Sequence, residues 1–230
     1  ANALLEVNIL KSKEAAFPIV IAPFEVIGDS NKNIDIAKII RDNLNRSGQF
    51  SALSTDALVT NQIDFNFWKE HKKDAVVFGK VEQISPKVYN IYIYIYDVFS
   101  EKSLYQKKIT VSNSGFRRMA HFLSDKIYYV LLGQKGSFNT RLSYVTVTDN
   151  DSGGRTYRLQ ISDSDGENPQ TIVRQSNPIL SPAWSKDQQK LAYVSFKNNR
   201  SEVFVITPFL KTIPIKLPRF DGIASSPTFH

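Results

Sequence analysis

The sequence predicts an α/β domain with a mixed sheet in residues 1–135, followed by an all-β segment in residues 136–230. Helical and strand periodicities alternate in the first part, whereas the second part contains only short strand-like runs between polar turns. The second part also repeats its own pattern at a spacing of about 45 residues, which is typical of β-propeller blades of four short strands. We therefore expect two domains, the second of which is an incomplete β-propeller.

The composition supports a folded chain without a strongly charged or membrane-spanning part. Hydrophobic residues make up 42% of the 230 residues, which is enough for a sizeable core. The net charge is +7, but residues 1–135 carry 18 basic and 14 acidic groups and residues 136–230 carry 11 and 8. Because this excess is spread thinly, we expect no nucleic acid partner. No apolar run approaches the roughly 20 residues of a membrane-spanning helix, so no direct membrane insertion is expected.

Two strand-like segments precede the first helical pattern. Residues 4–10 alternate, with Leu5, Val7 and Ile9 on one side, which indicates a short strand or a segment able to lie against one. Residues 17–24 form a continuous apolar run with prolines near its ends. Such a run is typical of a buried central strand.

Three segments of the first domain have helical periodicity. The first helix is predicted after Asn33, which can serve as its N-cap, and Gly48 can end it in a left-handed conformation. A shorter helix is predicted at residues 63–71. Residues 116–132 predict a long amphipathic helix that ends at Gly133.

Three consecutive strands are predicted at residues 75–84, 88–99 and 104–111, and the middle strand has two distinct faces. One face comprises Tyr89, Ile91, Ile93 and Ile95, and the other comprises Asn90, Tyr92, Tyr94 and Tyr96. We expect the aliphatic face to pack on helices, which predicts a compact α/β domain with helices on one or both faces of a mixed sheet. The tyrosine face is either an ordinary half-exposed sheet surface or a platform on which the bases of a single-stranded nucleic acid stack.

The second part of the chain repeats a strand pattern. Its predicted strands are residues 141–147, 157–162, 170–173, 181–184, 190–196, 201–206 and 213–217. Residues 141–147 match residues 190–196 in chemical type at a displacement of 49, and residues 181–184 match residues 226–229 at a displacement of 45. Since a single blade cannot bury both of its faces, it needs neighbours, and Trp184 is the large anchor expected between neighbouring blades.

Particular stretches of both parts carry a resemblance to a known family. They are PIVIAPF at residues 18–24, TRLSYV at 140–145, DSDGEN at 163–168, ILSPAWS at 179–185 and KLAYVSF at 190–196. In this order, and over essentially the whole chain, they resemble the TolB family, the periplasmic component of the Tol-Pal system of Gram-negative bacteria. The family usually has Pro-Asp-Gly where this chain has Lys186-Asp187-Gln188, a difference that affects only a turn.

The resemblance implies an N-terminal α/β domain followed by a six-bladed propeller, of which this chain would hold about two blades. It also implies a non-enzymatic protein-binding adaptor in the periplasm, which links TolA to Pal and supports outer-membrane integrity and envelope constriction during cell division. In the family, the Pal lipoprotein docks at the mouth of the propeller. Only part of that ring is expected here, so only part of the Pal contact is expected.

The resemblance further implies that the C-terminal domain of TolA takes the extreme N-terminal segment. The residues expected to contact it are Leu5, Val7, Ile9 and Leu10. An alternating segment with free backbone edges suits strand addition to a partner sheet. The same residues could instead form an edge strand of their own domain.

Catalytic and metal-binding motifs are not expected to explain the function. The sequence contains no Gly-x-Ser-x-Gly elbow, no dinucleotide or phosphate-binding glycine loop, no His-Glu-x-x-His motif and no cysteine. The histidines His71, His121 and His230 lie far apart in unrelated contexts. The stretches at residues 149–151 and 163–166 resemble the start of a calcium loop but lack its later ligands, so we expect them to be turns. No enzyme activity, cofactor or metal is therefore expected.

Overall fold

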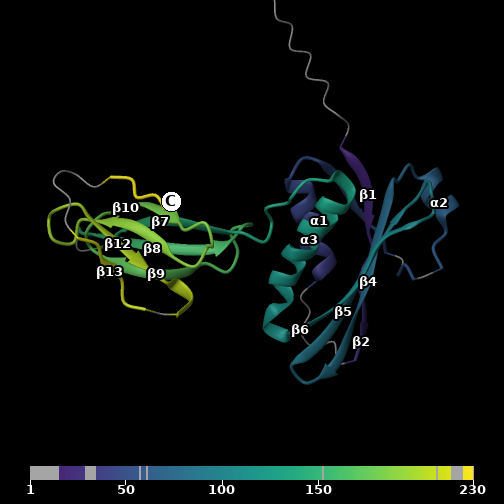
Figure 1. The fold of residues 1–230 in the computed structure, drawn as a ribbon, viewed down its shortest axis with the longest axis horizontal. Coiled ribbons are helices and arrows are strands. Elements are labelled where there is room, and N and C mark those ends of the chain that lie inside the picture. The colour runs from purple at the N-terminus through teal and green to yellow at the C-terminus, as the bar shows by residue number, and fades with distance from the viewer. Residues whose placement is uncertain are drawn as a thin grey trace, which may run out of the picture. The chain divides into compact units, whose positions relative to one another are not determined.

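The chain forms two units, Ala1–Asn139 and Thr140–His230 (Figure 1). The structure is a computed structural model that describes residues 16–28, 35–56, 58–60, 62–151, 153–210, 212–218 and 225–229. The predicted strand at residues 4–10 lies outside the described residues, together with Leu5, Val7, Ile9 and Leu10.

The first unit is built on a six-stranded mixed sheet. Five strands follow the order β3-β1-β4-β5-β6, and β2 is a further neighbour of β4. The strands are β1 (Phe17–Ile21), β2 (Glu25–Ile27), β3 (Phe50–Ser54), β4 (Ala75–Ser85), β5 (Val88–Asp97) and β6 (Ser103–Ser112). Strand β1 runs parallel to both β3 and β4, whereas β4, β5 and β6 form an antiparallel meander. The predicted mixed sheet is confirmed.

Strand β1 is the buried central strand that the apolar run predicted, but it is shorter than the run. It ends at Ile21, and the chain then continues as β2 beside the same neighbour, so that Ile19 pairs with Ala75 and Glu25 pairs with Lys80. The sequence did not predict β2 or β3. Strand β2 is only three residues long and exposed throughout, so it carries no alternation between buried and exposed positions.

The helices cover both faces of the sheet, as Figure 1 shows. They are α1 (Ile36–Arg46), α2 (Phe65–Glu70) and α3 (Phe116–Leu132), and a short 3-10 turn (Asn113–Gly115) precedes α3. Helices α1 and α3 pack on the face that carries Ile91, Ile93 and Ile95, each fully buried, which confirms the aliphatic face. Helix α2 places Trp68 in a second core on the opposite face.

The helix ends show two correct predictions and one incorrect prediction. Gly48 follows the end of α1 in the predicted left-handed conformation, with φ of 71°. Helix α1 begins at Ile36, and its N-cap is Asp35, whose side chain accepts a hydrogen bond of 2.9 Å from the backbone N–H of Lys38, so the N-cap predicted at Asn33 is wrong. Aspartate at this position satisfies a backbone donor that the helix itself leaves free. Helix α3 ends at Gly133, as predicted, because this residue adopts the left-handed conformation with φ of 68°.

The segment after α3 is held to the first unit by one carboxylate. Asp125 accepts hydrogen bonds from the backbone N–H groups of Phe138 and Asn139 at 2.8 and 3.1 Å. Phe138 is also 8% exposed and belongs to the main core. The first unit therefore extends to residue 139, four residues beyond the boundary that the change in periodicity suggested.

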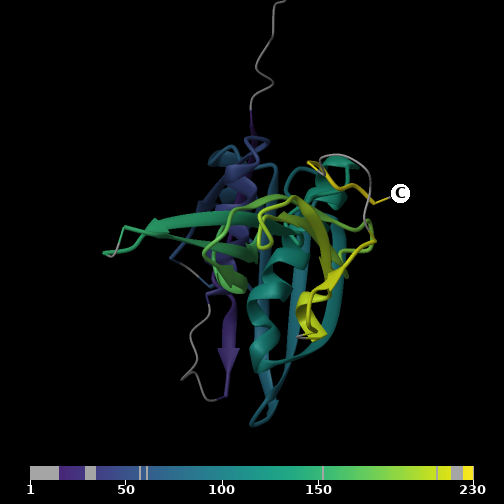
Figure 2. The same cartoon turned by 90° about the vertical axis from the view of Figure 1, so that its left-hand side faces the viewer.

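The second unit consists of two antiparallel sheets, seen from another side in Figure 2. The three-stranded sheet contains β7 (Arg141–Asp149), β8 (Arg155–Asp163) and β9 (Gln170–Gln175). The four-stranded sheet contains β10 (Ile179–Trp184), β11 (Leu191–Ser195), β12 (Glu202–Ile206) and β13 (Ile215–Lys216). The all-β prediction is confirmed, with one blade of four strands and one of three.

The two sheets of the second unit share one core. Leu159 from β8 and Leu191 from β11 are both fully buried in it, and Trp184 packs at its margin. The Trp184 ring also stacks on Phe209, with ring centres 6.1 Å apart and planes at 4°, while the Arg141 guanidinium lies 3.9 Å from the centre of the Phe209 ring. Trp184 thus packs against the core that both sheets share, and Phe209 is a partner that the repeat did not reveal.

The close approach of β5 to Gly79 generates a stability prediction. A methyl group at Gly79 would clash with the backbone oxygen of Tyr92 and the ring of Phe24, neither of which can move without disturbing the sheet. We expect Gly79→Ala to lower the free energy of unfolding of the first unit by about 2 kcal/mol or more. Urea denaturation followed by Trp68 fluorescence in a Trp184→Phe background measures this.

Gly115 provides the matched control for this substitution. A methyl group at Gly115 would make only ordinary van der Waals contacts, the nearest at 3.6 Å. Gly115→Ala should therefore lower the free energy of unfolding clearly less than Gly79→Ala does. Equal costs for the two variants would show that the sheet does not require glycine at position 79.

The buried Tyr193 of β11 generates a prediction about alkaline pH. Burial raises the pKa of Tyr193 to about 12, from its ordinary value of 10.0. The phenol therefore stays neutral to a higher pH in the folded state than in the unfolded state. Its contribution to the free energy of unfolding is complete below about pH 10 and is lost as the pH rises through about 12. We expect the urea midpoint of the second unit to fall between about pH 9 and about pH 11.5. Trp184 fluorescence in a Trp68→Phe background reports it.

Tyr193→Phe removes the ionisable group while keeping the ring that stacks on Phe204 at 5.6 Å. The midpoint of this variant should fall less over the same pH range. A fall as large as that of the parent protein would show that Tyr193 does not ionise on unfolding.

Candidate partner-binding site

The site residues predicted from the sequence precede β1, so the structure shows the place where their segment joins the fold. Residues 1–15 are attached at Ala16 to the amino end of β1, an inner strand of the sheet between β3 and β4. The backbone N–H of Phe17 donates a 2.8 Å hydrogen bond to the backbone oxygen of Gln49. The segment is thus connected to a fixed point of the sheet.

A row of packed aromatic rings begins at Phe17, where the segment joins the sheet. Phe17 contacts Phe50 edge-to-face at 5.9 Å, Phe50 contacts Tyr128 at 5.7 Å, and Tyr128 contacts Phe138 at 5.7 Å. Edge-to-face pairs of this kind add to the apolar burial of the rings. Sequence reasoning missed this row because its members come from β1, β3, α3 and the segment after α3, and no local spacing connects them.

Two carboxylates lie at the same end of the sheet. The backbone N–H of Asp74 donates to the backbone oxygen of Pro18, and the backbone oxygen of Asp74 accepts from Val98. Burial, and then the negative charge of Asp97, raise the pKa of Asp74 above its usual value. Hydrogen bonds from Ser100 lower the pKa of Asp97. This end of the sheet therefore carries an anionic group next to the start of β1.

The tyrosine face is only partly available as a binding surface. The Phe78 ring stacks on Tyr94 at 5.0 Å and on Tyr96 at 6.0 Å, and both tyrosines pack against the core that contains Trp68. Tyr92 donates a 2.9 Å hydrogen bond to Glu82, and its ring has the Lys80 ammonium 4.5 Å from its centre. Two of the three rings thus stack on protein groups, which leaves little of the platform that nucleic acid bases would need.

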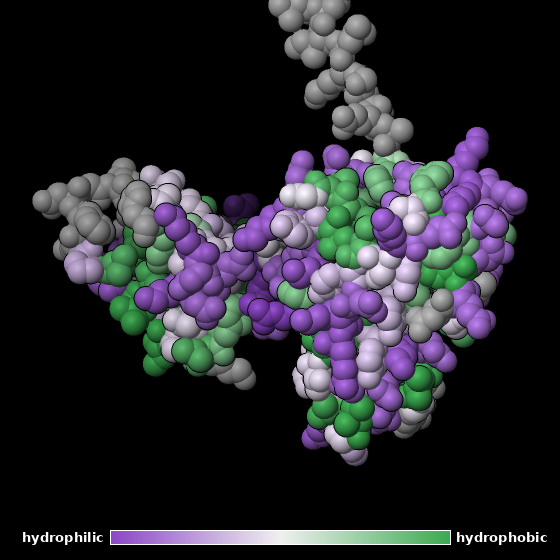
Figure 3. Space-filling view, turned by 45° about the vertical axis from the view of Figure 1, so that its right-hand side comes forward, coloured by the Kyte–Doolittle hydropathy of each residue, from purple (hydrophilic) through white to green (hydrophobic). Residues whose placement is uncertain are grey.

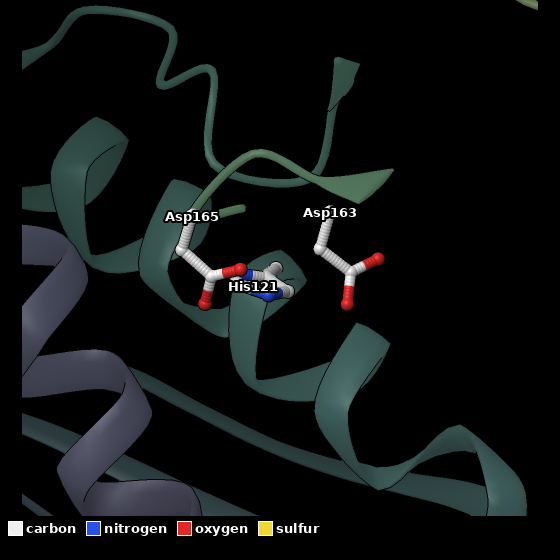
Figure 4. Close-up of side chains that lie close together, drawn as sticks. All are labelled: His121, Asp163 and Asp165. Atoms are coloured by element: carbon white, nitrogen blue, oxygen red, sulfur yellow. The ribbon is translucent and has the colours of Figure 1, made fainter. Parts of the chain in front are cut away.

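The described histidines have local structural contacts. The Nδ1 atom of His71 lies 2.7 Å from the backbone oxygen of Phe67. His121, shown in Figure 4, extends from α3, and its Nδ1 atom lies 2.9 Å from Nδ2 of Asn43 on α1. The Asn43 amide also donates to Ser124 at 2.9 Å, so this network joins the two helices. His230 lies outside the described residues.

Asp163 and Asp165, which Figure 4 also labels, belong to the second unit. Their carboxylates accept hydrogen bonds from Asn168 Nδ2 at 2.8 Å and from the backbone N–H of Glu167 at 3.2 Å, respectively. These bonds fit the turn that the sequence predicted after β8.

The exposed apolar residues of the first unit are scattered. In the view of Figure 3, hydrophobic areas of this unit are separated by hydrophilic residues. Within the described part of the chain, none of the helices combines the length and the apolar content needed to cross a membrane.

Two family models match the chain. The model of the TolB amino-terminal domain matches residues 5–104, and the model of the TolB beta propeller domain matches residues 128–230. The first range lies within the α/β unit, and the second covers the end of α3, the connection after it and the whole all-β unit.

Curated relatives named Tol-Pal system protein TolB match the chain along its length. The protein of Ruthia magnifica subsp. Calyptogena magnifica is 58% identical over 230 residues, which is 100% of this chain and 54% of the relative. The protein of Nitrosococcus oceani is 39% identical over 208 residues, which is 88% of this chain and 48% of the relative. The chain thus spans about half the length of these relatives.

A solved structure agrees with these matches. The crystal structure of TolB from Acinetobacter baumannii superposes with a TM-score of 0.78 and 33% sequence identity, and the match covers 90% of this chain and 50% of that chain. Because both family models, the relatives and this structure agree in the order of the two parts, the chain belongs to the TolB family and holds its amino-terminal domain and part of its propeller.

Proposed function

We propose that this chain acts by binding other proteins in the periplasm, as a component of the Tol-Pal system. The observation that carries the proposal is the 58% identity, over all 230 residues, to a protein named for that system. The proposed role is an adaptor between TolA and Pal, which supports outer-membrane integrity and envelope constriction during cell division.

The N-terminal segment is the proposed contact for the C-terminal domain of TolA. Its alternating side chains Leu5, Val7 and Ile9 would lie on one face of an added strand, and Leu10 would lie on the other. In strand addition, backbone hydrogen bonds supply much of the affinity and alternate side chains supply the specificity. The attachment of the segment at Phe17, beside a row of packed aromatic rings, supports this because a fixed base limits the volume that the segment explores.

The second unit is the proposed contact for the Pal lipoprotein. In the family, Pal docks at the mouth of a six-bladed propeller, and the two sheets of this unit correspond to about two of those blades.

The TolA proposal predicts the effect of charges placed in the N-terminal segment. Val7→Asp together with Ile9→Asp should weaken binding to the C-terminal domain of TolA about tenfold or more, because two buried apolar contacts would become unpaired carboxylates. Isothermal titration calorimetry on the full chain measures the dissociation constant. The circular dichroism of the variant should match that of the parent, since both positions precede the sheet.

Asn8→Asp is the matched control, because Asn8 lies between the two positions and faces the other way in an extended strand. It should change the affinity about twofold or less. Removal of residues 1–12 should abolish binding. Equal retention of the shortened and the parent chain by immobilised TolA domain would refute the proposed role of the segment.

A further inference from the structure

The outer edge of β6 is a second place where the first unit can accept a strand. β6 (Ser103–Ser112) is ten residues long and pairs with β5 on one side, and no described strand pairs with it on the other. Alternate backbone N–H and C=O groups of such an edge point away from the sheet. An extended peptide of matching length could therefore hydrogen-bond along it.

Partly buried apolar side chains accompany this edge. The register with β5 places Tyr105, Ile109 and Val111 on the face that α3 covers, because they lie opposite Ile95, Ile91 and Tyr89 of the main core. Met119 and Phe122 of α3 are partly buried against the same core. We call this surface, formed by Tyr105, Ile109, Val111, Met119 and Phe122, the β6–α3 groove.

A pocket lies between the end of β6 and the start of α3. It has a volume of roughly 310 Å³, and its lining combines the apolar side chains of Val111, Met119 and Phe122 with Gly115 and the polar residues Ser112, Arg118 and Asn139. This space is large enough for an apolar side chain of a bound peptide. Backbone pairing along an edge together with a side-chain pocket is the usual combination in peptide recognition by strand addition.

The charge around the groove is positive. Lys107 lies opposite Ile93 and so shares the groove's face, Arg118 borders the pocket, and the Lys126 ammonium lies 6.0 Å from the centre of the Tyr105 ring. β6 contains no acidic residue, and the one acidic residue of α3, Asp125, binds the backbone of Phe138 and Asn139. An anionic partner is therefore favoured.

We propose that the β6–α3 groove binds an extended acidic segment of a partner protein, which adds to the sheet as a strand beside β6 and inserts an apolar side chain into the pocket. Lysine on an edge strand opposes unspecific strand pairing. Acidic side chains on the added strand would lie opposite these lysines and offset that opposition. The chain's own residues 1–15 contain two acidic and two basic residues, so charge does not favour them as the occupant. The phosphates of a single-stranded nucleic acid could bind the positive charges around the groove, but a nucleic acid could not form backbone hydrogen bonds with the edge of β6.

The test uses the full chain and a synthetic ten-residue peptide in which glutamate alternates with valine. We expect saturable binding, with shifts of backbone amide signals in β6 and in the Met119–Phe122 region of α3 in the nuclear magnetic resonance spectrum. Lys107→Glu together with Lys126→Glu should weaken binding about tenfold or more, whereas Lys72→Glu, an exposed lysine after α2, should change it about twofold or less.

Three further arms separate backbone pairing from charge alone. The first arm uses the same peptide with alternate backbone nitrogens methylated. This peptide keeps its side chains but cannot form backbone hydrogen bonds with β6, so it should not bind. An oligothymidylate of equal charge should bind much more weakly than the peptide. Removal of residues 1–12 should leave the peptide affinity unchanged, so this proposal and the TolA proposal fail separately.

Several results would overturn the proposal. They are no saturable binding of the peptide, equal binding of the methylated peptide, equal binding of the oligothymidylate, and tighter binding after removal of residues 1–12. The last would identify the chain's own segment as the occupant of the groove.

Discussion

The first unit depends on the pairing of β4, which must accept different neighbours along its length. One side of β4 pairs with β1 near Ala75 and with β2 near Lys80, and the other side pairs with β5 over nearly its full length. Gly79 stands between these regions, where the backbone of β5 and the ring of Phe24 leave no room for a side chain. The sheet on which α1 and α3 pack exists only if this register is kept, because a shift by one residue would turn the isoleucines of β5 to the opposite face.

The same arrangement determines which backbone is free for binding. The inner strands pair on both sides, helices α1 and α3 cover one face of the sheet, and α2 covers part of the other around Trp68. Among the described strands, the unpaired margins are the outer edges of β6, β3 and β2, of which β6 is the longest, and the segment that precedes β1 joins the same sheet. Both proposed contacts therefore use extended backbone at the margins of a rigid sheet, and neither requires the sheet itself to open. Their chemistry differs, since one offers alternating apolar side chains and the other offers a basic groove.

The elements predicted well are those whose signal is local. Helix α3 has the predicted bounds because its apolar stripe is long and Gly133 ends it, and the two faces of β5 follow from strict alternation. Strand β3 was missed because only Phe50 and Ala52 of its five residues are buried, and its partner β1 lies about thirty residues earlier. The stacking of Phe78 on the tyrosine face was also beyond sequence reasoning, because it depends on the register between two strands. In the second unit, the repeat predicted Trp184 as an anchor, but Phe209 comes from a connecting segment outside the repeat.

Hydrogen exchange of the full chain, with and without the C-terminal domain of TolA, tests most directly whether binding uses the margins of a rigid sheet. The account predicts that the amides of β4 and β5 exchange slowest in the free chain and keep the same rates in the complex. New protection should appear within residues 1–15. Changed exchange in β4 and β5, or unchanged exchange in residues 1–15 while the complex is formed, would contradict it.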